Sequence, residues 1–376
     1  MKVLITGANG FVGKNLQLRL SERKDLQVVC FTREQRLEQL PDLLKDVDFV
    51  FHLAGVNRPQ DPKEFTVGNA DLTRALCDSV SSAALATGRT IHILHTSSTQ
   101  AGLENPYGRS KREAEEALRA IGRDHPLVPV HVFRLPNVFG KWCKPNYNSV
   151  VATFCHNIAR GLPIQINDPL STVTLVYIDD VLDRFIQIMD GADAVTGQDG
   201  FDLIAPQYTV TVGELARQIQ SFKDGRASLV TERVGVGLTR ALYSTYVSYL
   251  PVESFAYDVP QHADPRGVFV EMLKTPDCGQ FSFFTAHPGV TRGGHYHHSK
   301  TEKFLVIRGD AKFRFRHMHT GQRHELFTTG AKSQIVETVP GWTHDITNVG
   351  DGEMVVMLWA NEVFDRARPD TFACPV

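Results

Sequence analysis

The chain has 376 residues, 22% of them charged, and a formal net charge of −2. This balance excludes the excess of positive charge by which proteins attract nucleic acids or anionic membranes. No apolar run approaches the roughly 18 residues of a membrane-spanning helix, and the first residues predict a strand and a glycine turn rather than a signal peptide. We expect a cytoplasmic protein with no nucleic acid partner and no membrane insertion.

Segments of alternating character fill the first 135 residues. We predict strands at 2–6, 26–32, 47–55, 91–98 and 129–135, and helices at 14–23, 69–88 and 107–122. Strands that alternate with helices are typical of a parallel sheet with helices on both faces. The N-terminal part is therefore expected to be a Rossmann-type, doubly wound α/β domain.

The pattern loosens after residue 140 and changes completely near residue 250. Short strands separated by turn residues are predicted at 267–273, 279–286, 302–309, 311–318 and 353–360. This is typical of an all-β barrel or sandwich. At this length two domains are the default, and we place their boundary so that the domains are 1–245 and 246–376. The six cysteines lie far apart in the sequence, which argues against a disulfide framework.

A glycine turn joins the first strand to the first helix. The stretch "TGANGFVG" contains Gly7, Gly10 and Gly13. Glycines let the backbone turn sharply and approach a pyrophosphate, whose charge meets the helix N-terminus. A glycine turn in any βα unit could look similar, so the interpretation as a dinucleotide site depends on motifs further along the chain.

The segment after the fourth strand carries groups for proton transfer. Tyr107 and Lys111 are four residues apart, so they share one face of a helix. A nearby ammonium lowers the pKa of a tyrosine. A hydroxyl of Ser97, Ser98 or Thr99 could then bind the substrate oxygen while Tyr107 transfers the proton.

Residues 1–245 resemble the extended short-chain dehydrogenase/reductase family, which contains nucleotide-sugar epimerases, dehydratases and reductases. The resemblance includes the glycine turn, the Tyr-x-x-x-Lys spacing, "FHLAG", and "RLPNVFG". It implies catalysis by Ser98, Tyr107 and Lys111. It also implies dinucleotide contacts from Gly7, Asn9, Gly10, Phe11, Val12, Gly13, Thr32, Arg33, Leu53, Ala54, Gly55, Asn69 and Lys111. The spacing of eight residues between Ser98 and Tyr107 is shorter than is usual in that family, so Ser97 and Thr99 stay open as alternatives to Ser98.

The end of the second strand bears on the choice of dinucleotide. An NAD enzyme usually has an acidic residue there, which binds a ribose hydroxyl. This chain has Thr32 and Arg33 instead, and an arginine suits the 2′-phosphate of NADPH. We expect NADPH, with the alternative that Glu34 takes the part of the acid.

Eight of the 15 histidines lie between His287 and His344. The spacing His295-x-His297-x4-Glu302, followed by "PGWTH" ending at His344, resembles the two cupin motifs. Three imidazoles and a carboxylate suit a divalent transition metal, with zinc expected and iron or another divalent metal as alternatives. The competing interpretation is a histidine-rich surface loop. Four histidines have no place in either motif and are expected to be exposed, namely His298, His317, His319 and His324.

The stretches "DPRGVFVE" and "TRGGHYH" resemble the nucleotide-sugar 3,5-epimerases of the rhamnose pathway. Those enzymes use a histidine base where this chain has a candidate metal ligand, so their mechanism does not transfer as a whole. The resemblance points to a 4-keto sugar, because a proton next to a ketone can be removed if the enolate oxygen is stabilised.

Over its whole length the chain resembles bifunctional capsular polysaccharide enzymes of the CapF/WbjC type. This implies a UDP-linked 4-keto amino sugar, inverted at C3 by the cupin and reduced at C4 with NADPH. We also expect a homodimer built through the cupin, because edge strands of small β-domains need covering. The alternatives are a sensor of NADPH and sugar, a reductase whose cupin is only structural, and an iron dioxygenase fused to a reductase. Whether the metal is catalytic, and which base acts at C3, stay open.

Overall fold

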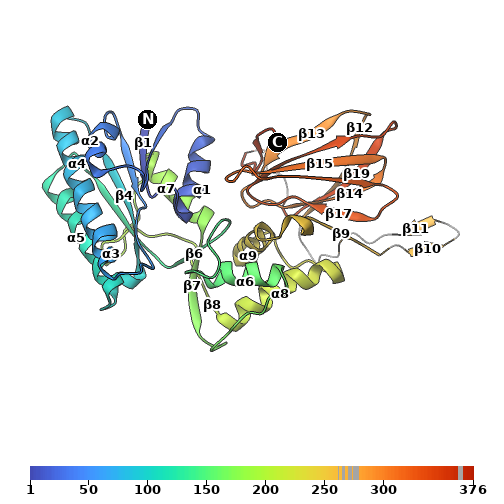
Figure 1. The fold of residues 1–376 in the computed structure, drawn as a ribbon, viewed down its shortest axis with the longest axis horizontal. Helices are drawn as coiled ribbons and strands as arrows, with labels where there is room; N and C mark the ends of the chain where they lie inside the picture. Colours follow the sequence, from blue (N-terminus) through green and yellow to red (C-terminus); the bar gives the residue numbers. More distant parts are fainter. Residues whose placement is uncertain (261, 265–266, 270–272, 274–278, 363–366) are drawn as a thin grey trace. The chain divides into compact units, whose positions relative to one another are not determined.

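The protein is described from a computed structural model (Figure 1). The structure describes residues 1–260, 262–264, 267–269, 273, 279–362 and 367–376. The chain forms two compact units, Met1–Val138 with Thr174–Tyr208 and Phe139–Val173 with Thr209–Val376. Among the described residues no helix is both long and apolar enough to cross a membrane.

A five-stranded sheet in the order β2-β1-β3-β4-β5 forms the centre of the first unit, and all its neighbouring strands are parallel. Its strands are β1 (Lys2–Thr6), β2 (Gln27–Phe31), β3 (Phe49–His52), β4 (His92–Ser98) and β5 (Val130–Leu135). Its helices are α1 (Phe11–Ser21), α2 (Leu40–Leu43), α3 (Lys63–Phe65), α4 (Leu72–Thr87), α5 (Pro106–Asp124) and α7 (Ile178–Met189). This confirms the predicted Rossmann-type fold.

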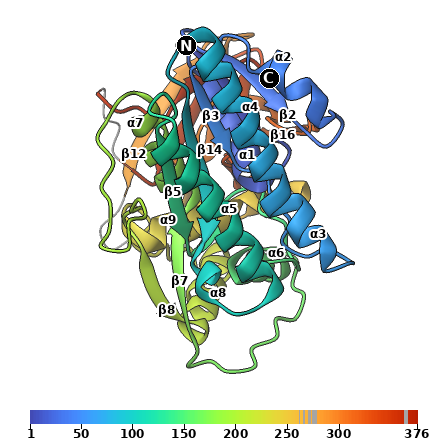
Figure 2. The same cartoon turned by 90° about the vertical axis from the view of Figure 1, so that its left-hand side faces the viewer.

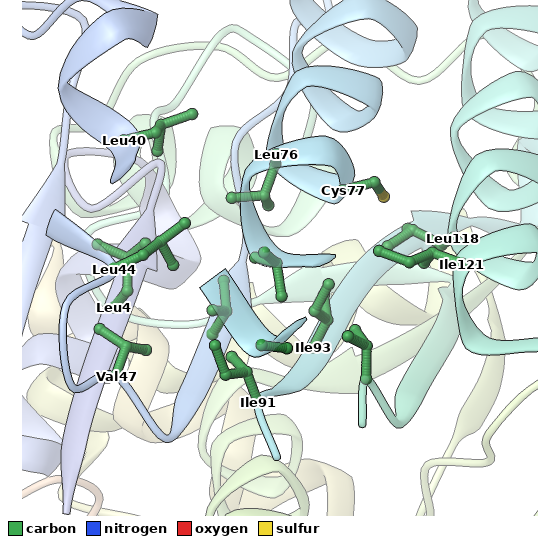
Figure 3. Packing of buried hydrophobic residues seen from close by; sticks show 14 of the residues in the cluster. Leu4, Leu40, Leu44, Val47, Leu76, Cys77, Ile91, Ile93, Leu118 and Ile121 are labelled. Carbon is green, nitrogen blue, oxygen red and sulfur yellow. The ribbon is translucent and has the colours of Figure 1, made fainter. Parts of the chain in front are cut away.

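Helices cover both faces of this sheet, which explains why all four residues of its central strand β3 are buried. On one face α4 and α5 lie side by side (Figure 2). There Leu4 and Ile93 of the sheet pack with Leu76 of α4 and Leu118 of α5 (Figure 3). On the other face Phe51 packs against α7, with its ring centroid 6.3 Å from that of Phe185.

The second unit contains two antiparallel five-stranded sheets, in the orders β12-β19-β14-β17-β9 and β16-β15-β18-β13-β20. The first sheet is built from β9 (Ala256–Asp258), β12 (Gln280–Ala286), β14 (Glu302–Arg308), β17 (Gln334–Glu337) and β19 (Met354–Ala360). The second is built from β13 (Thr291–Tyr296), β15 (Asp310–His317), β16 (Arg323–Thr329), β18 (Trp342–Asn348) and β20 (Phe372–Ala373). The predicted C-terminal cupin is confirmed. A separate pair, β10 (His262–Asp264) and β11 (Gly267–Phe269), lies between β9 and β12 in the chain, whereas Arg266 and Glu271 lie outside the described residues.

Three helices of the second unit, α6 (Val150–Ala159), α8 (Val212–Ser228) and α9 (Gly237–Ser248), pack on one another. Buried polar contacts also join them to the cupin strands. The guanidinium of Arg226 lies 3.2 Å from the carboxylate of Glu337, which is itself paired with Lys303. The strands β6 (Asn137–Phe139), β7 (Thr172–Tyr177) and β8 (Tyr208–Thr211) lie where the chain passes between the units. The boundary at 245/246 stays a prediction.

Candidate functional site

The glycine turn of the first unit leaves no room for side chains at two of its positions. Gly7 has a φ of +69°, and a Cβ there would come within 2.6 Å of the amide nitrogen of Ala54. A Cβ on Gly13 would come within 2.3 Å of the Gly7 carbonyl oxygen. The N-cap of α1 is Gly10, which has no side chain to cap the first amides of the helix. A close backbone turn at an open helix N-terminus fits a pyrophosphate.

The other expected dinucleotide contacts surround this turn. Gly7 donates a hydrogen bond from its amide to the carbonyl of Phe31, 3.2 Å away, which brings the end of β2 beside it. Thr32 is half-buried, and its amide donates to the side chain of Gln35 at 2.6 Å. Arg33 and Glu34 are both exposed, so burial does not distinguish which of the two would contact the ribose of a dinucleotide. Asn9 and Gly10 are exposed, whereas Phe11, Val12, Leu53 and Ala54 are half-buried.

Gly55, Asn69 and Lys111 converge on one point. A Cβ on Gly55 would lie 3.0 Å from the Asn69 Oδ1 and 3.2 Å from the Lys111 Nζ. Asn69 belongs to a short π-helix, η2 (Thr66–Asp71), and its amide group bonds both backbone groups of Val56. It also donates to the hydroxyl of Ser110 at 2.9 Å. Asn69 therefore ties the turn after β3 to helix α5.

Helix α5 presents Tyr107 and Lys111 from its first two turns. The side chain of Asn105 caps the helix by accepting from the amide of Gly108 at 2.7 Å. Lys111 is buried and donates to the carbonyl of Thr96 at 3.1 Å. Burial lowers the pKa of Lys111 to about 8, and the charge of Glu115 opposes this shift. A partly desolvated ammonium next to a tyrosine on the same helix face can tune that tyrosine for proton transfer.

The three neighbouring hydroxyls at the end of β4 have different surroundings. Ser97 is buried and donates to the carboxylate of Glu115, which also forms a two-pronged ion pair with Arg134 at 2.7 and 2.9 Å. Ser98 is half-buried, and its Oγ accepts from the amide of Gln100 at 3.2 Å. Thr99 is exposed. Ser97 thus has a structural partner, which favours Ser98 as the hydroxyl that meets a substrate.

One buried histidine, His52, was not singled out from the sequence. It contacts residues that hold the expected dinucleotide contacts Ala54 and Asn69 in place. The His52 Nδ1 lies 2.7 Å from the Thr6 hydroxyl and its Nε2 lies 2.8 Å from the Thr73 hydroxyl. Thr6 accepts from the amide of Ala54, and Thr73 donates to the carbonyl of Asn69. Burial lowers the pKa of His52 to about 3, so the ring is neutral. Only its position directly before "LAG" could have pointed to it.

The second unit brings together all four expected metal ligands. The candidate ligand atoms of His295, His297, Glu302 and His344 lie within 4.8 Å of one another. His295 is on β13, and His297 follows directly after that strand. Glu302 begins β14 in the other sheet, and His344 lies on β18 opposite His295.

The electrostatics of this cluster suit a cation. Burial lowers the pKa of His295 to about 3 and also lowers that of His344, so both imidazoles are neutral and can donate a lone pair. Neither ring nitrogen of buried His344 makes a hydrogen bond within the described part of the chain, although the Glu302 Oε2 lies 3.5 Å from Nε2. Lys300 pairs with the Glu302 Oε1 at 2.8 Å, which leaves Oε2 facing the histidines. The residues present fit a divalent metal.

The remaining histidines differ partly from expectation. His298 was expected to be exposed but is buried, because its ring packs against those of Tyr296 and Phe372 at centroid distances of 5.6 and 5.1 Å. His317 and His324 are half-buried, and His319 is exposed. None of these four belongs to the cluster of candidate ligands.

Comparison with known proteins gives the family. Residues 3–202 match the model of the NAD dependent epimerase/dehydratase family, and residues 262–372 match a polysaccharide biosynthesis C-terminal domain. The chain belongs to the NAD-dependent epimerase/dehydratase family. It is similar to the UDP-2-acetamido-2,6-beta-L-arabino-hexul-4-ose reductase of Pseudomonas aeruginosa, with 64% identity over 100% of this chain and 99% of the relative.

Two further matches show how far this family likeness extends. The crystal structure of the capsular polysaccharide assembling protein CapF from Staphylococcus aureus matches with a TM-score of 0.67 and 39% identity over the full length of both chains. The UDP-glucose 4-epimerase of Vibrio cholerae is 25% identical over 58% of this chain and 74% of its own. Within the epimerase/dehydratase family, the chain is therefore of the CapF/WbjC type, in which a Rossmann-type domain is followed by a cupin.

Proposed function

We propose that the chain is a bifunctional nucleotide-sugar enzyme. Its cupin epimerises UDP-2-acetamido-2,6-dideoxy-β-L-arabino-hex-4-ulose at C3, and its Rossmann-type unit then reduces C4 to give UDP-N-acetyl-6-deoxy-L-talosamine. The observation that carries the proposal is the presence of two separate chemical sites, each within its own compact unit, in a chain that matches a UDP-sugar reductase from end to end. Such a product would serve capsule or O-antigen synthesis.

In the reductase unit the chain's own residues supply the proton and hold the ketone. Tyr107 donates its phenolic proton to the C4 oxygen, and the ammonium of Lys111 stabilises the phenolate that forms. The hydroxyl of Ser98 donates a hydrogen bond to the same oxygen and fixes its orientation. Since Ser97 is engaged by Glu115, Ser98 is the hydroxyl that we assign to this task.

NADPH is the dinucleotide that we propose, and it would supply the hydride to C4. The glycine turn and the N-terminus of α1 would bind its pyrophosphate, and Arg33 would bind the 2′-phosphate. The turn at Ala54 and Gly55, held by Asn69, would line the dinucleotide next to Lys111. Glu34 is exposed beside Arg33 and is the alternative partner of an unphosphorylated ribose.

In the cupin, His295, His297, Glu302 and His344 would hold one divalent metal, which we propose is zinc. A metal there would supply a positive charge able to stabilise the oxygen of an enolate. The four residues come from both sheets of the cupin, so the same ion would also join the sheets.

The reductase half of the proposal is tested by Tyr107→Phe. Removing the phenolic proton should lower NADPH oxidation with the 4-keto UDP-sugar by at least ~10²-fold, the usual scale for a lost general acid. Dinucleotide binding, measured by fluorescence titration, should be unchanged, because the phenyl ring remains. Turnover within a few-fold of the parent protein would contradict the assignment of Tyr107.

A further inference from the structure

A short connection sets the position of the one carboxylate among the candidate metal ligands. Residues 297–301 join β13, which carries His295, to β14, which begins with Glu302. The two strands belong to different sheets. The path of this connection, whose first residue is His297, therefore decides how far Glu302 lies from the histidines.

A single acidic side chain from the far end of the sequence binds this connection. The Asp370 Oδ1 accepts from the amide of His298 at 2.9 Å, and Oδ2 accepts from the amides of Ser299 at 2.8 Å and Lys300 at 2.7 Å. The Ser299 hydroxyl also lies 3.2 Å from Oδ2. Three consecutive amides thus converge on one carboxylate, an arrangement that suits an anion.

The next two amides of the same segment are bound by side chains as well. The Thr301 amide donates to the Asn361 Oδ1 at 2.9 Å, and the Glu302 amide donates to the Thr338 hydroxyl at 2.9 Å. Every backbone N–H from 298 to 302 therefore has a side-chain partner outside the segment. Because such bonds restrain each peptide plane, the segment has a defined path without relying on a metal.

The backbone of Asp370 acts on a candidate ligand directly. The His297 Nδ1 lies 2.5 Å from the Asp370 carbonyl oxygen. A carbonyl oxygen only accepts, so the Nδ1 of His297 carries a proton. With Nδ1 occupied in this way, Nε2 is the nitrogen that can bind a metal, and it faces the Glu302 Oε2 at 3.2 Å. Metal-binding histidines are commonly oriented by such a hydrogen bond from the ring nitrogen that does not bind the metal.

Asp370 is itself anchored by the C-terminal strand. Strand β20 pairs with β13, with Phe372 opposite Tyr296 and Ala373 opposite His295. The amide of Cys374 donates to the carbonyl of Gly294 at 2.7 Å. The last residues thus run along the strand that carries His295, and they fix Asp370 beside His297.

We propose that Asp370 is a positioning residue for the metal centre, set by the C-terminal strand. Its carbonyl binds the Nδ1 of His297 and so turns Nε2 toward the other ligands, and its carboxylate holds the segment that places Glu302. The proposal rests on the proposed metal site but concerns a residue that is not a ligand. Its consequence is that the four ligands are arranged before a metal binds.

The substitution Asp370→Asn separates the two tasks. It keeps the carbonyl bond to His297, but an amide nitrogen takes the place of one acceptor oxygen and faces the N–H groups of the segment instead of accepting from them. The control is Asp351→Asn, which makes the same chemical change at an exposed position between β18 and β19.

The experiment measures zinc affinity of the full-length, metal-stripped protein by competition with a coloured chelator. The parent protein and Asp351→Asn should each bind about one zinc per chain with equal affinity, and Asp370→Asn should bind ~10- to 100-fold more weakly, the usual loss when an outer partner of a ligand is removed. Equal affinity in Asp370→Asn would overturn this proposal alone. A parent protein that binds no zinc would overturn the metal site together with it.

A second measurement on the parent protein covers the case in which Asp370→Asn does not fold. Amide hydrogen exchange of the metal-stripped parent should show slow exchange for the peptide that contains residues 298–302, because side chains and not the metal hold those amides. Fast exchange there, with slow exchange only after zinc is added, would overturn the proposal without any variant.

Discussion

At the scale of single residues, the end of β4 offers three hydroxyls one after another, and their partners separate their tasks. The Ser97 hydroxyl belongs to a buried network with Glu115 and Arg134. The next residue, Ser98, is half-buried, whereas Thr99 is exposed. Spacing alone left all three open, because the segment before Tyr107 is short and contacts with Glu115 are not visible in a motif.

Alanine substitutions should distinguish these hydroxyls. Ser98→Ala should lower the turnover number for reduction, since it removes a hydrogen bond to the reacting oxygen. Ser97→Ala should keep turnover but lower the free energy of unfolding by about 1 kcal/mol, because the buried Glu115 carboxylate loses one of its hydrogen-bond donors while keeping Arg134. Thr99→Ala is the matched control and should change neither quantity. Loss of turnover in Ser97→Ala with normal turnover in Ser98→Ala would exchange the two roles.

The buried ammonium of Lys111 predicts a pH dependence. Burial lowers the pKa of Lys111 to about 8, so the group is charged below that pH and loses its charge as the pH rises through it. In the proposed mechanism, the charged form stabilises the developing phenolate of Tyr107. The turnover number for reduction should therefore fall as the pH rises through about 8.

The control for this pH profile is Lys111→Arg. A guanidinium stays protonated throughout the range, so the fall near pH 8 should disappear in this variant even where its rate is lower overall. An unchanged fall in Lys111→Arg would show that another group titrates there, and Lys111 would lose its assigned part in the pH dependence.

At the scale of elements, β12 and β16 are end strands of the two cupin sheets, and they differ in how well they could pair with a second chain. Two phenylalanines on the same face of β12, Phe281 and Phe283, are 47% and 71% exposed. The corresponding exposed face of β16 instead carries two charged residues and one aromatic residue, namely Arg323, Glu325 and Phe327. Charges on an edge strand resist pairing, so β12 is the strand that we propose joins two copies into a homodimer.

Sedimentation velocity of the full-length protein tests this dimer. The parent protein should sediment as a dimer at micromolar concentration, and Phe283→Asp should shift it to a monomer, because a charge would be buried in the interface. Phe327→Asp is the matched control on the other edge, where the ring is 65% exposed, and it should stay dimeric. A parent protein that sediments as a monomer would contradict the proposal, as would a dimer that survives Phe283→Asp.

The helices and strands were easier to predict from the sequence than the long-range contacts between them. The strands and helices of the first unit follow from apolar segments whose spacing reflects burial, and the fold class was predicted correctly from them. The packing of α9 on the cupin depends on contacts such as that of the Ser244 hydroxyl with the carbonyl of Ser299, 2.5 Å apart. No local pattern encodes such a long-range contact. The same is true of Asp370, which lies 73 residues from His297 in the sequence.

At the scale of the whole molecule, the two proposed reactions must occur in a fixed order. Once the C4 ketone has become an alcohol, the C3 hydrogen has no neighbouring carbonyl and is no longer acidic. Epimerisation therefore precedes reduction, and a reductase on the same chain can consume the epimer that it prefers. Under the proposed function, this order gives a chemical reason for joining the cupin and the Rossmann-type unit in one protein.

The most direct test is deuterium incorporation at C3 of the 4-keto UDP-sugar, monitored by NMR in heavy water with full-length protein. Without NADPH, Tyr107→Phe should still exchange the C3 hydrogen, because the cupin is intact. His344→Ala should leave C3 unlabelled, and with NADPH it should yield only a product not inverted at C3. Exchange that persists in His344→Ala, or that vanishes in Tyr107→Phe, would contradict the division of labour between the two units.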